Sequence, residues 1–137
     1  MKSSKLLTLC AMLLLLAPAF AQTGNGKAKI PFDFQIGNQT LSAGDYRVKT
    51  EGVKLQLSRI GGPDYAVVMT ISVPGDRASN GSPRLVFNRY GDEHFLSEAW
   101  LGASDNGNRL FTSASEVRLG QSMQDTGVSV AKVQNTK

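Results

Sequence analysis

The sequence has little of the side-chain chemistry that most catalytic and metal sites require. Its 137 residues include one cysteine, one histidine and one tryptophan, at Cys10, His94 and Trp100. A single cysteine excludes a disulfide within the chain, and one histidine leaves mainly carboxylates as metal ligands. The sequence also lacks a phosphate-binding loop, a dinucleotide fingerprint and a Gly-x-Ser-x-Gly elbow. We therefore expect no metal and no cofactor.

A large excess of charge of one sign is also missing. The chain has 15 Lys and Arg residues against 11 Asp and Glu. Two of the basic residues, Lys2 and Lys5, lie at the N-terminus, so residues 22–137 carry 13 basic and 11 acidic residues, a net charge of +2. This mild balance gives no reason to expect nucleic acid or an anionic membrane as a partner.

Only one long hydrophobic run occurs, and it lies at the N-terminus. Residues 6–20 are almost entirely apolar, follow two lysines, and end in Ala19-Phe20-Ala21, the small-x-small pattern of a signal-peptidase site. A run of about 15 residues is shorter than the 20 or so that a membrane anchor needs. We predict a signal peptide over residues 1–21, cleaved near Ala21. The mature protein would be periplasmic or secreted and not membrane-spanning.

Glycine, by contrast, is abundant, and all 14 glycines lie after residue 23. Residues 22–29 are polar and unpatterned and indicate a flexible leader, and residues 134–137 indicate a polar tail. Between them, short runs of alternating hydrophobicity are separated by glycine-containing turns, which is typical of strands. Residues 65–73 are the most apolar of these runs, and we expect them near the middle of a sheet. The predicted strands cover residues 30–36, 46–50, 53–58, 65–73, 84–90, 95–101 and 128–133.

This pattern over residues 30–133 predicts a single all-β domain. It would be an antiparallel sandwich or a small up-and-down barrel of about seven or eight strands. Residues 113–121 hold the one helix candidate, because Ser113 and Glu116 have the spacing of a capping box. A short strand over residues 116–119 is the alternative, and the sequence leaves both open.

The densest polar cluster lies around the only histidine. A catalytic interpretation makes His94 a base, with Asp92, Glu93 or Glu98 as its acid or orienting partner. We favour a solvated turn at residues 91–93, because a lone histidine has neither a second ligand nor an activated nucleophile to act with. Residues 105–108 are rich in oxygen ligands but lack the spacing of a calcium loop, and they predict a turn.

A second group of residues predicts either a structural ion pair or a ligand site. If Tyr90 paired with Phe95, four side chains would share one side of a hairpin: Phe87, Arg89, Glu98 and Trp100. Arg89 would then either pair with Glu98, bind a ligand carboxylate or stack on Trp100. We favour the structural pair. A one-residue change of register would separate the group.

Three segments are similar to a known group of proteins. They are Ile-Pro-Phe-Asp-Phe-Gln-Ile-Gly at residues 30–37, Leu-Ser-Ala-Gly-Asp-Tyr-Arg-Val at residues 41–48, and Leu-Val-Phe-Asn-Arg-Tyr-Gly-Asp at residues 85–92. Together they resemble small exported β-rich proteins, mostly from acidobacterial genomes, that have no established activity. Ser42 stands where we expect proline. The resemblance covers roughly residues 30–119, implies a bacterial envelope or secreted setting, and transfers no catalytic residue.

These observations predict an exported, non-enzymatic β domain. We expect it to bind a small apolar or amphipathic ligand within its barrel or between its sheets. One alternative is a structural or protein-interaction module of the cell envelope that pairs through an exposed edge strand, such as the strand containing Pro31. Another is an enzyme of unknown class centred on His94.

Overall fold

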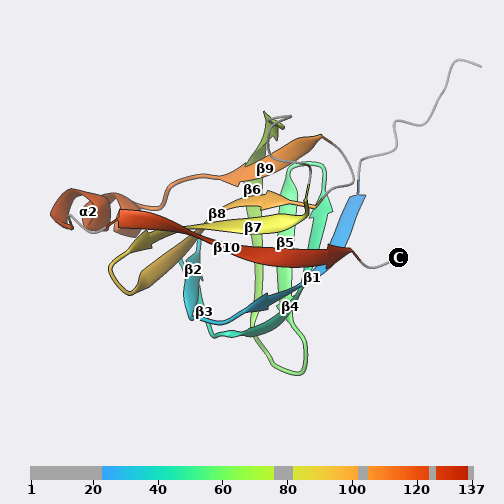
Figure 1. Cartoon of the computed structure of the whole chain (residues 1–137), viewed down its shortest axis with the longest axis horizontal. Coiled ribbons are helices and arrows are strands. Elements are labelled where there is room, and N and C mark those ends of the chain that lie inside the picture. Colours follow the sequence, from blue (N-terminus) through green and yellow to red (C-terminus); the bar gives the residue numbers. More distant parts are fainter. Residues whose placement is uncertain (1–22, 76–81, 102–104, 124–125, 136–137) are drawn as a thin grey trace, which may run out of the picture.

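The computed structural model of the chain describes residues 23–75, 82–101, 105–123 and 126–135, so the predicted signal peptide lies outside the described residues. Within these ranges, ten strands and one helix, α2 (Ala114–Ser122), are arranged as shown in Figure 1. The strands are β1 (Thr23–Ile30), β2 (Phe34–Ile36), β3 (Gln39–Leu41), β4 (Gly44–Glu51), β5 (Lys54–Arg59), β6 (Tyr65–Pro74), β7 (Arg84–Tyr90), β8 (Glu93–Trp100), β9 (Asn106–Leu110) and β10 (Thr126–Asn135).

Eight of the described strands close into a barrel, which confirms the predicted all-β fold. The order around the barrel is β1-β4-β5-β6-β9-β8-β7-β10, and β10 pairs back with β1. This order departs from a simple up-and-down arrangement at two connections. The chain passes from β6 to β7 although β6 pairs with β9, and from β9 to β10 although β9 pairs with β8.

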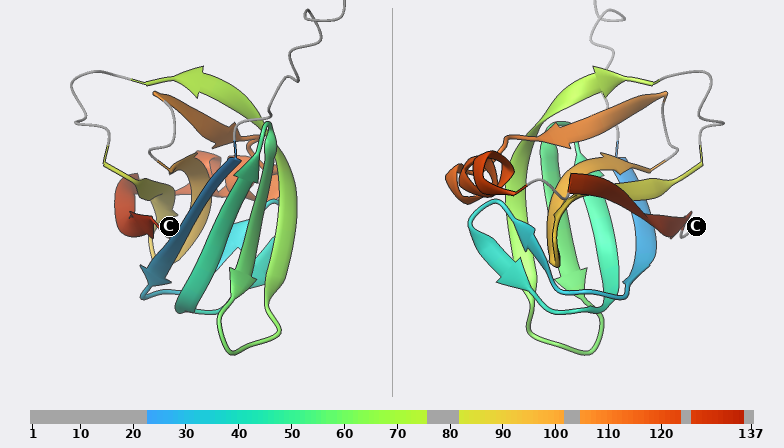
Figure 2. Two further views of the ribbon diagram at one scale, coloured as in Figure 1. Left: turned by 90° about the vertical axis from the view of Figure 1, so that its right-hand side faces the viewer. Right: turned by 60° about the vertical axis from the view of Figure 1, so that its left-hand side comes forward.

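Two strands form corners of the barrel because each pairs with different neighbours along its length. In β6, residues 65–69 pair with β5 and residues 70–74 pair with β9. In β10, residues 126–132 pair with β7 and residues 133–135 pair with β1. We use the name sheet A for β1, β4, β5 and residues 65–69 of β6, which lie side by side in Figure 2 (left).

The interior of the barrel is filled by side chains. Eight hydrophobic side chains have 0% relative exposure, so they contact neither bulk water nor a void large enough to hold water. The centre is therefore a packed hydrophobic core. These eight residues are Ile36, Tyr46, Val48, Leu55, Leu57, Leu85, Phe87 and Ala99.

Strand β1 corrects the prediction of a flexible leader over residues 22–29. Its inward positions are Gly24, Gly26, Ala28 and Ile30, and its outward residues between them are exposed. The alternation was missed because three of the four inward residues are too small to register as hydrophobic. Small residues are needed here: a Cβ at Gly24 would lie 2.8 Å from Oγ1 of Thr50. Strand β10 likewise extends into the predicted tail, as far as Asn135.

The single strand predicted over residues 30–36 is in fact two strands. β1 ends at Ile30 and β2 begins at Phe34, with Pro31, which has no N–H to donate, at the break. Asp33 in this break accepts a hydrogen bond from the backbone N–H of Ala43, at 2.8 Å. Pro31 therefore does not form an edge strand. β2 lies between β3 and β8, and β3 is the outer edge.

Residues 114–122 form a helix and not the alternative strand. The side-chain oxygen of Ser113 caps it by accepting a hydrogen bond from the N–H of Glu116, at 3.2 Å. Residues 106–110, by contrast, form β9, which includes most of the turn predicted at residues 105–108. Gly107 is on the outer face of this strand, where the Trp100 ring covers it: a Cβ there would lie 2.6 Å from ring carbons.

The filled core predicts that two Phe→Ala substitutions will differ greatly in their effect on the free energy of unfolding. Phe87→Ala removes a fully buried ring and should lower the free energy of unfolding by about 3–5 kcal/mol. Phe111→Ala removes a ring that is 66% exposed and should change it by less than about 0.5 kcal/mol. Urea unfolding followed by circular dichroism measures both, and equal losses would contradict a packed interior.

Candidate functional site

The β7–β8 hairpin turns more tightly than the sequence suggested, and this changes which side chains meet. Tyr90 pairs with Glu93 and not with Phe95, so Gly91 and Asp92 alone make the turn, with Gly91 at φ 59°. The register also shifts between Val86 and Phe87. The predicted pairing, and the grouping of side chains that depended on it, are therefore wrong.

The four predicted ligand-binding residues are divided between the two sides of the hairpin. Phe87 is in the core, with no exposed surface. Arg89 lies opposite His94, and its Nη1 donates to the carbonyl oxygen of Gly91 at 3.2 Å. Glu98 and Trp100 are on the outer face. The expected Arg89–Glu98 pair does not form.

Glu98 is instead held by two other side chains. Its Oε1 accepts from Nη2 and Nε of Arg109, at 3.0 and 3.1 Å, and its Oε2 accepts from Nε1 of Trp100, at 2.9 Å. The guanidinium of Arg84 lies 5.0 Å from the centroid of the Trp100 ring, in a cation–π contact. Both oxygens of Glu98 are thus engaged, and the arrangement fastens β7, β8 and β9 to one another.

The three weaker catalytic candidates do not form an acid–base group among the described residues. The His94 ring stacks on Phe32, with centroids 3.7 Å apart and planes at 12°, and its buried Nδ1 has no hydrogen-bond partner there. Asp92 is in the turn, and Glu93 accepts from Nε2 of Gln35 at 3.4 Å. In the described part of the chain, no group of three or more His, Cys, Asp or Glu residues could hold a metal ion.

A buried carboxylate was missed as a site by the sequence reasoning. Glu116 is only 5% exposed, and its Oε1 accepts from Nδ2 of Asn88 at 2.7 Å and from the hydroxyl of Tyr90 at 3.2 Å. Burial and the neighbouring carboxylate raise the pKa of Tyr90. The capping-box spacing identified Glu116 but assigned it to the helix N-terminus. Its side chain instead attaches α2 to β7.

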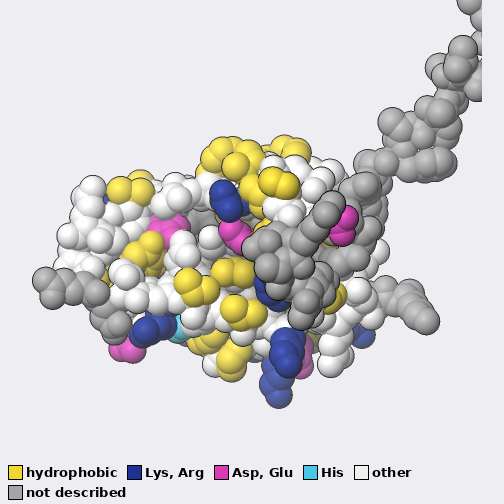
Figure 3. All heavy atoms as spheres, turned by 45° about the horizontal axis from the view of Figure 1, so that its top comes forward, with side chains coloured by type: hydrophobic (Ala, Val, Ile, Leu, Met, Phe, Trp, Pro, Cys, Tyr) yellow, Lys and Arg dark blue, Asp and Glu magenta, His cyan; other side chains and the backbone are white. Residues whose placement is uncertain are grey.

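The most unusual surface feature is a row of exposed apolar side chains on β6, which we call the β6 row. Four alternate residues point outward over about 20 Å, with exposed fractions of 51, 42, 58 and 43%. Figure 3 shows hydrophobic side chains gathered over β6 and β9. Large contiguous apolar patches on a soluble protein commonly mark a surface that contacts a partner or a ligand. The row consists of Tyr65, Val67, Met69 and Ile71.

The position of β6 corrects the expectation that residues 65–73 lie in the middle of a sheet. Within the described residues, the first half of β6 pairs with β5 only, so it lies at the margin of sheet A. Bulky residues on both faces of a strand predicted burial on both faces. Here Ala66 and Thr70 point inward and are buried, while the larger side chains are outside.

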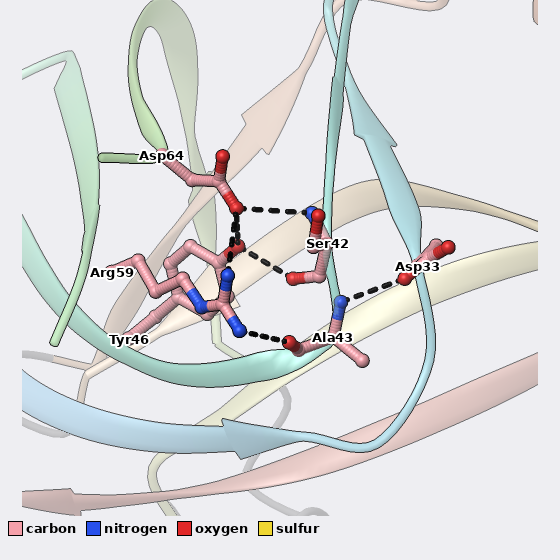
Figure 4. A network of polar contacts seen from close by, with 6 residues as sticks. All are labelled: Asp33, Ser42, Ala43, Tyr46, Arg59 and Asp64. Carbon is pink, nitrogen blue, oxygen red and sulfur yellow. Dashed lines mark hydrogen bonds and ion pairs between the residues drawn. The ribbon is translucent and has the colours of Figure 1, made fainter. Parts of the chain in front are cut away.

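A polar network holds the start of β6 (Figure 4). The Tyr46 hydroxyl donates to the carbonyl oxygen of Ser42 at 2.6 Å and lies 3.3 Å from Oδ2 of Asp64, the residue before β6. The same Oδ2 accepts from the Ser42 N–H, at 3.3 Å, and from Nη1 of Arg59, at 3.5 Å. Nη2 of Arg59 donates to the carbonyl oxygen of Ala43, at 3.1 Å. The network ties the turn before β4 to the turn before β6.

Two features of this network follow from its tight packing. Gly44 and Gly62 flank the Arg59 side chain, and a Cβ at either position would lie 2.7 Å from one of its atoms. Burial, together with the charge of Asp64 and the contact with it, raises the pKa of Tyr46 to about 12. The segment at residues 41–46 is therefore a structural element, in which the backbone of Ser42 and Ala43 and the hydroxyl of Tyr46 hold two turns together.

Comparison with known proteins adds no assignment. No family model matches the chain, and no match was found among curated proteins or among solved structures. None of the described helical segments is long and apolar enough to cross a membrane.

The Tyr46 network predicts a pH-dependent effect of one hydroxyl group. Tyr46→Phe removes the bond to Ser42 and should lower the free energy of unfolding by about 1 kcal/mol at pH 7. The pKa of Tyr46 in the folded protein is above the usual value of 10. The stabilisation that its neutral hydroxyl contributes is therefore fully present below pH 10 and is lost as pH rises towards 12.

The difference between wild type and Tyr46→Phe should therefore shrink between pH 9 and pH 11, as measured by urea unfolding. Tyr65→Phe, the same change at a half-exposed position, is the matched control and should have little effect at either pH. A difference for Tyr46→Phe that stays constant up to pH 11 would show that the hydroxyl is not held as described.

Proposed function

We propose that the protein is an exported, non-enzymatic β domain that binds an apolar or amphipathic molecule along the β6 row. The observation that carries this proposal is the set of four outward apolar side chains on one strand. Export is supported by the signal-peptide pattern over residues 1–21 and by the resemblance to small exported β-rich proteins.

The outer surface is a more favourable place for a ligand to bind than the interior of the barrel. An internal ligand must replace core side chains, and the central ones, such as Tyr46 and Phe87, have no accessible surface. The β6 row is already in water, so covering it releases that water without disturbing the core. Phe111 follows β9, the neighbour of β6, and adds another exposed ring on this side of the barrel.

A non-enzymatic role is supported by the way in which the polar clusters are satisfied. Glu98, Glu116 and Asp64 each accept hydrogen bonds from at least two side-chain or backbone donors of the protein. A general base needs a free lone pair within reach of substrate, and these carboxylates are engaged in holding elements together. His94 stacks on an aromatic ring without an orienting carboxylate among its described contacts.

A protein-interaction module is the second candidate, and one observation favours it. Residues 65–69 of β6 have a strand partner on one side only within the described residues, so a strand from another protein could add there. The side chains of the β6 row point out of the sheet, however, and strand addition uses the edge within the plane. We therefore rank surface binding first.

A neutral apolar dye, N-phenyl-1-naphthylamine, tests the proposal. Wild-type protein should bind it with a rise in dye fluorescence. The double variant Val67→Ser, Met69→Ser should bind about tenfold more weakly, because covering two half-exposed apolar side chains contributes about 1–2 kcal/mol. Dye titration, with circular dichroism to verify folding, measures the effect.

The matched control is Val128→Ser, Val130→Ser, which removes two exposed apolar side chains from β10 instead. It should bind the dye as wild type does. The proposal is wrong if wild type does not bind the dye, or if both double variants lose binding equally.

A further inference from the structure

Basic side chains share the outer face of sheet A with Tyr65, Val67 and Met69 of the β6 row. They occupy outward positions that alternate with buried residues, and each is exposed or half-exposed. We call them the basic face. Its members are Lys27 and Lys29 on β1, Arg47 and Lys49 on β4, and Lys54 on β5.

The basic face begins directly beside the β6 row. Lys54 pairs with Met69 across β5 and β6, and Lys49 lies one strand further, opposite Gln56. With strands about 4.8 Å apart, the basic face extends from about 5 to about 15 Å from the row. The outer surface of sheet A thus changes from apolar to basic across four neighbouring strands, which lie side by side in Figure 2 (left).

Acidic residues do not neutralise this surface. Glu51 forms ion pairs with Lys49 and Lys54, at 3.7 and 3.2 Å, and Asp45 lies opposite Lys29. Five basic and two acidic residues leave a charge of +3 on the outer face of β1, β4 and β5. The other acidic residues within the described ranges lie off this face: Asp33, Asp64, Asp92, Glu93, Glu98, Asp105 and Glu116.

One pair on the basic face is unfavourable in the free protein. Lys27 and Arg47 lie directly opposite each other on β1 and β4, and neither has an ion-pair partner among the described residues. Like charges at such positions destabilise a sheet. An anionic surface placed over them would convert this repulsion into attraction.

We propose that the outer face of sheet A binds the surface of an anionic lipid bilayer, with the β6 row at the acyl boundary and the basic face against the headgroup phosphates. This inference rests on the proposed function, because it names the partner of the β6 row. A bilayer satisfies both halves of the surface at once. A soluble anion would use only the basic face, and a neutral apolar ligand only the row.

Vesicle flotation tests the proposal with the full chain, purified in the form that a bacterial host yields. Vesicles of phosphatidylcholine alone are compared with vesicles containing 30% phosphatidylglycerol, in 0.1 M NaCl. Wild type should bind the anionic vesicles more tightly, and 0.5 M salt should weaken that binding. Lys27→Gln, Arg47→Gln should weaken it about 25-fold, at about fivefold per basic residue, and leave binding to neutral vesicles unchanged.

Lys27→Gln alone should weaken binding to the anionic vesicles about fivefold. Its matched control is Arg118→Gln, which removes one charge from an exposed position on α2. It should bind as wild type does. Equal losses in both charge variants would show that net charge, and not the basic face, is responsible, and would overturn the proposal.

The remaining outcomes separate this inference from the proposed function. Equal binding to neutral and anionic vesicles, lost in Val67→Ser, Met69→Ser, would overturn the inference and leave surface binding by the β6 row intact. Dye binding without vesicle binding would do the same. Concentration-dependent dimerisation abolished by that variant, without vesicle binding, would make a second copy of the chain the partner. Absence of both dye and vesicle binding would overturn both proposals.

Discussion

Closure of the barrel between β1 and β10 is the constraint on which the rest of the structure depends. Gly26 pairs with Asn135 and lies diagonally beside Val133, which pairs with Ala28, and a Cβ at Gly26 would overlap the Val133 side chain. Glycine and alanine along the inner side of β1 therefore allow the first and last described strands to pair. Once the ring is closed, large side chains from the other strands fill its centre. Apolar groups outside the barrel are then available only to contacts made from outside.

The polar clusters connect elements that are distant in the chain. Glu116 joins α2 to β7, Glu98 joins β8 to β9, and Asp64 joins the turn before β6 to the turn before β4. A buried or half-buried carboxylate is costly unless it is hydrogen-bonded, and each of these is well supplied with donors.

The fold distributes the charged residues unevenly over the surface of the protein. Residues 22–137 carry a net charge of only +2, which argued against an anionic partner. The outer face of β1, β4 and β5 nevertheless carries +3, because alternation sends charged residues outward and strand pairing puts three such strands side by side. Of the nine acidic residues in the described ranges, seven lie off this face. A surface can therefore attract an anionic partner although the whole chain is nearly neutral.

The sequence alone determined the features whose signals are local. The alternation at residues 46–50 and 53–58, with Gly52 between them, predicted the β4–β5 hairpin. At residues 113–121 the capping-box spacing left a helix and a short strand both open, and the structure forms the helix. Only the tertiary structure decided that β1 is a strand, that Trp100 meets Arg84 and not Arg89, and that β6 has an uncovered apolar face. Alternation identifies the two faces of a strand, but which neighbour covers each face depends on register and ring closure. Those are properties of the whole barrel.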